Sequence, residues 1–229
     1  MRAPLLLALA ALIGSGCASS RRSAHERNPI VFVHGWSSSA SVWATMTARF
    51  QADGWPEAYL VAWSYDTSQS NVETAEQLAH QVDSLLARTG ARRVDIVSHS
   101  MGALPARYYA RNLGGAARID GWASLGGPSH GTITAFACFA RSCREMRPGS
   151  AFLRALNEGD ETPGPTRYAT WRSPCDLVIL PQDSPVLEGA VNEATVCLLH
   201  LELPTNATVY AQVRDWLAAN EPGRAAVTW

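Results

Sequence analysis

Lysine is absent from the sequence, and all nineteen of its Lys and Arg positions are arginine. This absence excludes a catalytic or Schiff-base lysine and every mechanism that depends on one. Net charge is also small, −1 at pH 7 with histidine neutral. We therefore expect no nucleic acid and no acidic polymer as a partner.

The sequence also lacks a hydrophobic run long enough to span a bilayer, since the apolar run Leu5–Ile13 is far too short. This run follows the basic start Met1-Arg2 and precedes the small residues 14–16. That order is typical of a secretory signal. We predict that residues 1–16 are a signal peptide and that the protein is exported.

A cysteine, Cys17, follows these small residues directly. The position is similar to that of the lipidated cysteine in bacterial lipoprotein signals, which usually carry leucine where this chain has Gly14. Residues 17–27 are rich in serine and arginine without apolar periodicity, and we predict a tether. The expectation is a membrane-anchored lipoprotein facing the periplasm or the cell surface, with simple secretion as the alternative.

Cysteine is scarce and odd in number, five in all. With Cys17 assigned to lipidation, four remain, and an exported protein should pair them in two disulfides with three possible connectivities. Local spacing favours Cys138–Cys143 and Cys175–Cys197. A metal site is the weaker interpretation because the sequence has no CxxC pair and no histidine at ligand spacing from these cysteines. We predict neither metal nor cofactor.

Strand and helix patterns alternate along residues 28–229, which we predict to be one domain. Apolar and β-branched runs predict the strands, and apolar residues at helical spacing predict the helices. The alternation indicates an α/β fold, a three-layer sandwich of a mostly parallel sheet with helices on both faces. The predicted strands are Ile30–Val33, Ala58–Trp63, Val94–Val97, Ile119–Leu125, Thr166–Trp171 and Ala194–Leu199. The predicted helices are Ser39–Gln51, Asn71–Arg88, 103–109, Ser150–Leu156 and Asn206–Ala219. In the last of these we expect Val209, Val213, Trp216 and Leu217 to be buried.

The strand Val94–Val97 ends in Ser-His-Ser-Met-Gly, and a helical pattern follows. A strand, a sharp turn and a helix are the context of a nucleophile elbow, which holds Ser100 at the apex of a strained turn. Gly102 supplies the small residue needed where strand and helix backbones approach. Ser98 stands where the usual pattern has glycine. The alternative is an ordinary strand–helix junction with a polar turn.

A nucleophilic serine needs a base, and in this fold the chain order is serine, acid, histidine. Only His130 and His200 follow Ser100 in the sequence. His130 leaves almost no chain for an acid, whereas His200 directly follows the last predicted strand. We predict His200 as the base, with a structural histidine as the alternative.

The acid is expected between Ser100 and His200, at the carboxyl end of a strand. Asp176 follows the strand Thr166–Trp171 by a short turn and is our prediction, with Asp183 as its best rival. Asp120 begins a strand, and Asp160 lies in a Gly/Pro-rich loop. A Cys175–Cys197 bridge would clamp the acid loop to the base loop.

An oxyanion hole is the remaining requirement. The backbone N–H of Met101, directly after the nucleophile, should supply one donor, and that of Trp36, after the first strand, the other. We expect His34 to hold this loop by hydrogen bonds, and His99 to be packed against a neighbouring strand and not to act as the base.

Five segments, in their order and spacing, resemble the small secreted bacterial lipases of the class 2 group within the α/β-hydrolase superfamily. They are Asn28–Trp36, Val94–Gly102, Leu125–Pro128, Ser173–Asp176 and Cys197–His200. The resemblance implies the α/β-hydrolase fold, a triad of Ser100, Asp176 and His200, and oxyanion donors at Trp36 and Met101. Ser98 and Ala103 depart from it, because relatives often have glycine or alanine and then glycine there.

We therefore expect an exported, monomeric serine hydrolase that cleaves carboxylic esters of acyl chains, with a small-molecule ester or lipid as substrate. Residues 129–165 leave room for a small cap at most. Trp36, Trp43 and Trp122 are expected either to line an acyl groove or to belong to the core. The alternatives are a thioesterase, phospholipase or polyester depolymerase on the same scaffold, or a catalytically silent surface-binding lipoprotein.

Overall fold

Six strands form a single sheet in the order β2-β1-β3-β4-β5-β6. A computed structural model describes residues 27–219, so the predicted signal peptide (1–16), Cys17 and nearly all of the predicted tether lie outside the described residues. Every neighbouring pair of strands is parallel, which confirms the predicted sheet. The strands are β1 (Ile30–Val33), β2 (Leu60–Ala62), β3 (Val94–His99), β4 (Ile119–Leu125), β5 (Arg167–Arg172) and β6 (Val191–Ala194).

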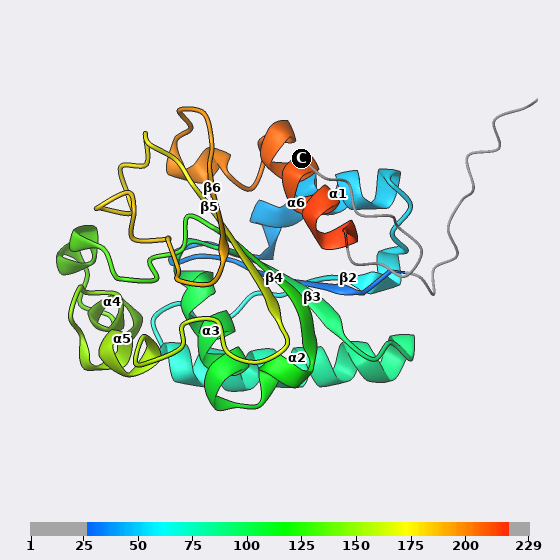
Figure 1. The fold of residues 1–229 in the computed structure, drawn as a ribbon, viewed down its shortest axis with the longest axis horizontal. Coiled ribbons are helices and arrows are strands. Elements are labelled where there is room, and N and C mark those ends of the chain that lie inside the picture. Colours follow the sequence, from blue (N-terminus) through cyan, green and yellow to red (C-terminus); the bar gives the residue numbers. More distant parts are fainter. Residues whose placement is uncertain (1–26, 220–229) are drawn as a thin grey trace, which may run out of the picture.

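Helices cover both faces of this sheet, as Figure 1 shows. On one face lie α1 (Ala44–Ala52) and α6 (Ala207–Ala218), and on the other α2 (Asn71–Thr89) and α3 (Ala103–Asn112). The short helices α4 (Arg141–Glu145) and α5 (Ala151–Leu156) pack against the start of α3. The 3-10 turns are η2 (Ala40–Trp43), η3 (Glu57–Tyr59), η4 (Ser100–Gly102), η5 (Gly115–Ala117), η6 (Ile133–Ala137) and η7 (His200–Glu202).

The core consists of one apolar layer on each side of the sheet. Along β1, Ile30 and Phe32 face the layer under α1 and α6, whereas Val31 and Val33 face the layer under α2 and α3. A strand that is buried on both faces needs apolar side chains throughout, which is why β1 is an unbroken run of apolar residues. Trp43 and Trp122 are fully buried in these layers, and so they belong to the core and not to an acyl groove.

Polar side chains set the helix boundaries. The hydroxyl of Ser70 accepts a hydrogen bond from Val72 N–H and caps α2, which begins at Asn71 as predicted. Gly90 ends that helix in the left-handed conformation, with φ 70°. Asn206 caps α6 through two backbone N–H groups. These caps fix where α2 begins and ends and where α6 begins, and so they fix the position of both helices against the sheet.

Two predictions about the carboxyl-terminal part are wrong. The last strand is Val191–Ala194, and residues 195–199, which the sequence placed in a strand, form a loop. The loop is held by the disulfide of Cys197 and by Ser173, whose hydroxyl bonds Leu198. Trp216 was expected to be buried in the core, but it is only half-buried, with the guanidinium of Arg167 4.6 Å from its ring centroid.

Candidate active site

Ser100 lies immediately after β3, in a backbone conformation that side chains rarely adopt. Its φ is 55°, inside the left-handed region, and α3 begins three residues later. A Cβ atom on Gly102 would lie 2.5 Å from the carbonyl oxygens of both Val33 and His34. The glycine is therefore required by the close approach of β1 to the turn, as the sequence predicted. Strand, strained turn and helix together hold the Ser100 hydroxyl at the carboxyl edge of the sheet.

The loop after β1 lies directly against Ser100. A Cβ atom on Gly35 would lie 2.7 Å from the Cβ of Ser100 and 3.2 Å from its hydroxyl oxygen. His34 donates from Nδ1 to the carbonyl oxygen of Gly35 at 2.9 Å. Because a trans peptide is planar, this bond also fixes the direction of the Trp36 N–H, which points away from that carbonyl. In the described residues 27–219 the Trp36 N–H has no hydrogen-bond acceptor, and so it is free to bind a ligand oxygen.

Tyr65 holds His34 in place, and sequence reasoning missed it. The Tyr65 hydroxyl donates to the backbone carbonyl of His34, and the Tyr65 N–H donates to His34 Nε2 at 3.4 Å. The two rings also stack, with centroids 4.1 Å apart. Burial lowers the pKa of His34, so its ring is neutral and suited to one donor and one acceptor role. His34 therefore has the structural role expected for it.

His200 and Asp176 form a buried pair. His200 Nδ1 lies 2.7 Å from Asp176 Oδ2, and both side chains are almost completely buried. The other carboxylate oxygen accepts hydrogen bonds from the backbone N–H groups of Val178 and Ile179, at 2.8 and 2.9 Å. Burial alone would raise the pKa of Asp176, but the bonds from His200, Ile179 and Val178 outweigh it and lower that pKa. The carboxylate is therefore ionised and can fix the orientation of the imidazole.

The second ring nitrogen of His200 is free. His200 Nε2 is buried and finds no hydrogen-bond partner among residues 27–219. His99, the residue before Ser100, donates from its own Nε2 to the backbone carbonyl of His200 at 3.0 Å. The rings of His99 and His200 lie 4.6 Å apart. Burial lowers the pKa of His99 to about 3, which keeps its ring neutral. These contacts bring His200 to the same end of the sheet as Ser100.

The loops that carry Asp176 and His200 are joined to each other. The predicted disulfides are both present, and Cys175–Cys197 links the residue before Asp176 to the loop before His200. The buried hydroxyl of Ser173 adds a second link, because it donates to the Leu198 carbonyl at 2.6 Å and accepts from the Leu198 N–H at 2.9 Å. In the sequence, Ser173 is only the first residue of the segment Ser173–Asp176, and no role is predicted for it.

The rival candidates lie elsewhere. His130 lies 2.9 Å from Glu161 and bonds the backbone of Ser184. Asp183 is exposed, and Asp120 pairs with Arg167 at the amino end of the sheet. No group of three or more His, Cys, Asp or Glu side chains suited to a metal occurs in the part of the chain that the structure describes.

Large apolar side chains are exposed beside the buried pair. They lie directly after Asp176, in the segment around His200 and in the loop after β1, so they border the edge of the sheet where Ser100 lies. Single exposed apolar side chains are common, but several gathered at one edge of a sheet are typical of a binding surface. The residues are Trp36, Leu177, Val178, Val196, Leu199 and Leu201.

Comparison with known proteins points to one family. A family model described as lipase (class 2) matches residues 27–186. The mature form of the lipase BlEst2 from Bacillus licheniformis is similar in structure, with a TM-score of 0.73 at 16% identity over 84% of this chain and 92% of that one. Lipase B from Aspergillus fumigatus gives a TM-score of 0.74 at 17% identity over 86% of this chain and 54% of that one. These structures share the α/β-hydrolase fold. In the described residues, none of the helices has the length and apolar content to cross a membrane.

Proposed function

This chain belongs to the class 2 lipase family, and from that membership we propose that it hydrolyses carboxylic esters of acyl chains through an acyl-enzyme on Ser100. The observation that carries the proposal is the buried Asp176–His200 pair, whose ring nitrogen Nε2 has no partner in residues 27–219. A nitrogen in this state can accept the proton of a serine hydroxyl, which is the step that makes serine nucleophilic.

The first half of the reaction forms the acyl-enzyme. The Ser100 hydroxyl oxygen attacks the ester carbonyl carbon while His200 Nε2 takes its proton. Ionised Asp176 accepts from Nδ1–H, which holds the tautomer and stabilises the imidazolium that forms. Collapse of the tetrahedral intermediate breaks the bond to the alcohol, which leaves with the proton returned by His200.

The second half releases the acid. Water attacks the acyl carbonyl, His200 takes a proton from that water, and Ser100 leaves with the proton when the carboxylic acid is released. In both halves the negative oxygen is held by the backbone N–H groups of Trp36 and Met101. The bond from His34 to the Gly35 carbonyl supports this role, because it sets the direction of the Trp36 N–H.

The exposed apolar side chains beside the pair favour a substrate with an acyl chain. Leu177 and Val178 follow the proposed acid, and Leu199 and Leu201 flank the proposed base. An acyl chain that covers these side chains removes apolar surface from water, at about 25 cal/mol for each Å². Thioesters, phospholipids and polyesters also present acyl carbonyls, so they belong in the test.

The test is labelling with a fluorophosphonate probe, followed by peptide mapping. We expect one adduct, on Ser100, that is abolished in Ser100→Ala and strongly slowed in His200→Ala. A folded protein that does not react would overturn the proposal and favour a silent surface-binding protein. A panel of p-nitrophenyl esters of increasing chain length, triglycerides, acyl-thioesters, phospholipids and polyesters then identifies the ester class.

We also propose that the protein is exported, processed after residue 16 and lipidated at Cys17, and that it acts as a monomer. The two disulfides support export, because such bonds persist in oxidising compartments. All the proposed catalytic groups come from one chain, which supports a monomer. Metabolic labelling with a fatty acid, with Cys17→Ala as the control, tests the anchor. Unlabelled protein released into the medium would favour simple secretion, and light scattering of the purified protein gives its oligomeric state.

A further inference from the structure

We propose that residues 133–154, here called the cationic loop, form a docking surface for an anionic lipid membrane. The cationic loop comprises η6, the disulfide-closed turn after it, α4 and the first residues of α5. The inference goes beyond ester hydrolysis, because it concerns the surface on which the protein sits. It does not depend on the nucleophile or on the lipid anchor.

The cationic loop exposes large apolar side chains. Phe139 is 80% exposed, and Phe136 and Ile133 are each 57% exposed. The Cys138–Cys143 disulfide closes the turn that carries Phe139, with Cα atoms 5.7 Å apart. A closed turn has fewer conformations to lose on binding, so less affinity is spent on ordering it. The exposed phenylalanines are thus presented on a restrained turn, in a form suited to insertion between lipid headgroups.

The cationic loop also carries positive charge that is not balanced by carboxylates. It contains four arginines and one acidic residue, Glu145. The Glu145 side chain is only 14% exposed, and its carboxylate also accepts hydrogen bonds from Ser70 and Asn71 at the start of α2. Arg141 pairs with Glu73 and Glu145.

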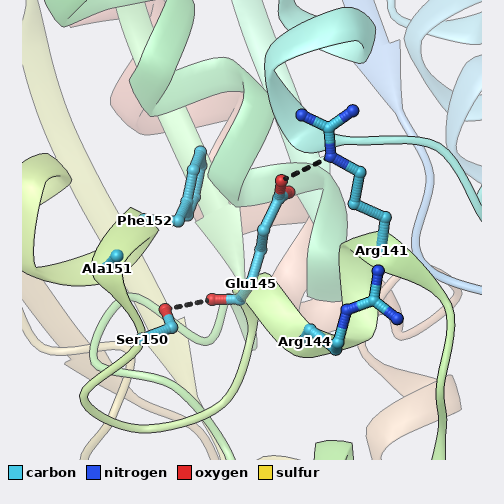
Figure 2. Close-up of a pocket in the computed structure, with 6 residues that line it drawn as sticks. All are labelled: Arg141, Arg144, Glu145, Ser150, Ala151 and Phe152. Carbon is cyan, nitrogen blue, oxygen red and sulfur yellow. Dashed lines mark hydrogen bonds and ion pairs between the residues drawn. The ribbon is translucent and has the colours of Figure 1, made fainter.

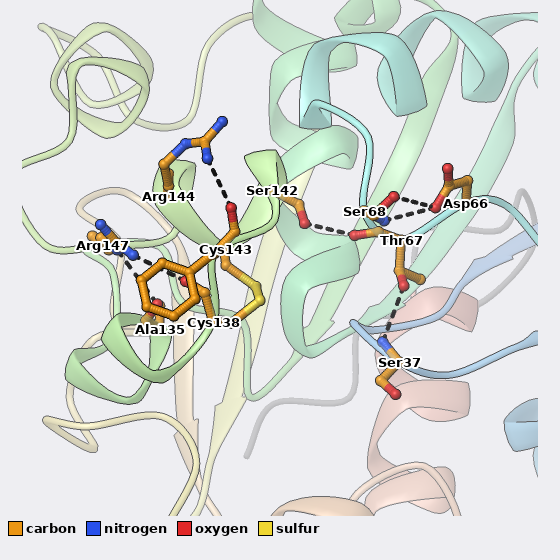
Figure 3. The surroundings of a disulfide bond; sticks show 11 residues. Ser37, Asp66, Thr67, Ser68, Ala135, Cys138, Ser142, Cys143, Arg144 and Arg147 are labelled. Carbon is orange, nitrogen blue, oxygen red and sulfur yellow. Dashed lines mark hydrogen bonds between the residues drawn. A yellow bond between two sulfur atoms is a disulfide. The ribbon is translucent and has the colours of Figure 1, made fainter.

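The other three arginines of the loop hydrogen-bond only to backbone carbonyls within residues 27–219, and the Arg147 guanidinium also lies 5.0 Å from the ring centroid of Phe136. Arg144 donates to Phe139, and Arg147 donates to Ala135 and Cys138. Arg154 donates to Gly149. Figure 3 shows Arg144 and Arg147 on the same side of the disulfide, opposite Ser142 and Thr67. Charge and exposed aromatic rings therefore lie together on one short segment.

A pocket of about 340 Å³ lies on the same loop. Figure 2 shows Arg141 and Arg144 on one side of it and Ala151 and Phe152 on the other. Glu145 lies between these walls, paired with Arg141, and Ser150 completes the lining. Guanidinium groups bind phosphate oxygens through directed N–H donors, and a nearby aromatic ring suits the acyl side of a lipid. Of the two pocket arginines, Arg144 has no carboxylate partner within residues 27–219, so its guanidinium, near the ring of Phe152, suits the phosphodiester of an anionic lipid. A neutral lipid has no net charge to attract the unbalanced arginines.

The cationic loop is joined to the candidate active site. The hydroxyls of Thr132 and Thr134 both donate to the Val178 carbonyl at 2.7 Å, and the Ile133 N–H donates to the Leu180 carbonyl at 3.0 Å. Ile133 thus lies beside the exposed Val178, two residues beyond Asp176. A membrane bound to the cationic loop would therefore lie next to the carboxyl edge of the sheet, where acyl substrates are proposed to enter.

The test is co-sedimentation of the full chain with vesicles, in a Cys17→Ser, Ser100→Ala background that removes the acyl attachment site and prevents hydrolysis. Vesicles are made of phosphatidylcholine alone or of equal parts phosphatidylcholine and phosphatidylglycerol. We expect at least about tenfold stronger binding to the anionic vesicles at low salt, weakened by high NaCl. Phe139→Ser should weaken that binding about tenfold. Arg144→Gln with Arg154→Gln should weaken it about 25-fold, about fivefold for each charge.

Two controls separate charge from packing. Arg88→Gln with Arg92→Gln removes two exposed arginines outside the loop and should leave binding unchanged. Arg144→Lys with Arg154→Lys keeps the charges and should also bind, and thermal unfolding of each variant reports its fold. Equal binding to both vesicle types, or equal binding by the glutamine and parent proteins, would overturn the proposal. Displacement by inorganic phosphate, but not by NaCl of equal ionic strength, would assign the pocket to free phosphate and also overturn it.

Discussion

His99 Nε2 donates a hydrogen bond to the backbone carbonyl of His200, so the residue before the proposed nucleophile holds the proposed base. The bond is 3.0 Å long, and the two rings are only 4.6 Å apart. A positively charged His99 would repel the imidazolium that forms on His200 during the reaction. Because burial lowers the pKa of His99 to about 3, His99 can orient its neighbour without that repulsion.

Replacing His99 by phenylalanine should slow the reaction without abolishing substrate binding. The aromatic ring would still pack edge-on against Trp43, but the donor to the His200 carbonyl would be lost. We expect kcat to fall about 10- to 100-fold, because small misplacements of a catalytic group have effects of this size. KM should change little. The measurement is steady-state hydrolysis of a soluble p-nitrophenyl ester.

The rate of fluorophosphonate labelling at Ser100 supplies the control, because it depends on the base and not on substrate affinity. It should fall by the same factor as kcat. A variant with normal kcat and normal labelling would show that the bond from His99 does not position His200.

The same variant should change how stability depends on pH. The pKa of His99 is lowered from 6.5 to about 3 in the folded protein. Between these pH values the unfolded chain binds a proton at His99 that the folded chain does not. The contribution of His99 to the free energy of unfolding is therefore complete above pH 6.5 and is lost as the pH falls toward 3. The loss from this group is about 1.4 kcal/mol for each pH unit. The measurement is urea unfolding of both proteins at pH 7, 6, 5 and 4. As the pH falls, we expect the free energy of unfolding of the wild type to decrease relative to that of His99→Phe. If the free energy of unfolding depended on pH in the same way in both proteins, the lowered pKa of His99 would be contradicted.

The sequence predicted the parts of the site that follow from local rules. The elbow was visible because a buried strand, a polar turn and a helix follow one another in the chain. The neighbours of the elbow compensate for its departures from the family pattern. A Cβ atom on Gly127 would lie 2.4 Å from that of Ala103, so glycine at 127 leaves room for the larger residue. Ser98 Oγ bonds the carbonyl of Ala123 on β4.

Contacts between distant segments could not be predicted from the sequence. Tyr65 bonds His34, Ser173 bonds Leu198, and His99 bonds His200, and each pair is far apart in the chain. Tyr65 lies outside the five segments that resemble the family, and the order and spacing of those segments do not show which of their residues contact one another. The mistaken strand at 194–199 has a similar cause, since Val196 and Leu199 are exposed beside the site and only Leu198 enters the core.

Removing the Cys175–Cys197 disulfide should affect both stability and catalysis. The bond joins the loops of Asp176 and His200, and it closes a loop with a sequence separation of 22. We expect Cys175→Ala with Cys197→Ala to lose about 3 kcal/mol of unfolding free energy. The kcat should also fall about tenfold because the acid and base loops are no longer clamped.

The matched control for this variant is Cys138→Ala with Cys143→Ala, which opens a bond with a sequence separation of only 5. Because this bond does not link the acid and base loops, kcat should fall less than in the first variant. Equal kcat losses in the two double variants would indicate a general effect of losing a disulfide and would contradict a specific clamp. Urea unfolding and steady-state hydrolysis of a soluble ester are measured for both.

Gly35 tests the contact between the proposed oxyanion loop and the nucleophile. Alanine at this position would bring a Cβ atom to 2.7 Å from that of Ser100, so either the Trp36 N–H or the hydroxyl must move. We expect Gly35→Ala to lower kcat/KM at least about 100-fold, as expected for loss of one oxyanion donor, and stability by about 1–3 kcal/mol. Gly90→Ala is the control: it adds a Cβ atom at a φ of 70° with nothing within 4 Å, so it should cost about 1 kcal/mol and leave kcat unchanged. Wild-type kcat/KM in Gly35→Ala would mean that the loop after β1 tolerates displacement and contributes no donor to the reaction.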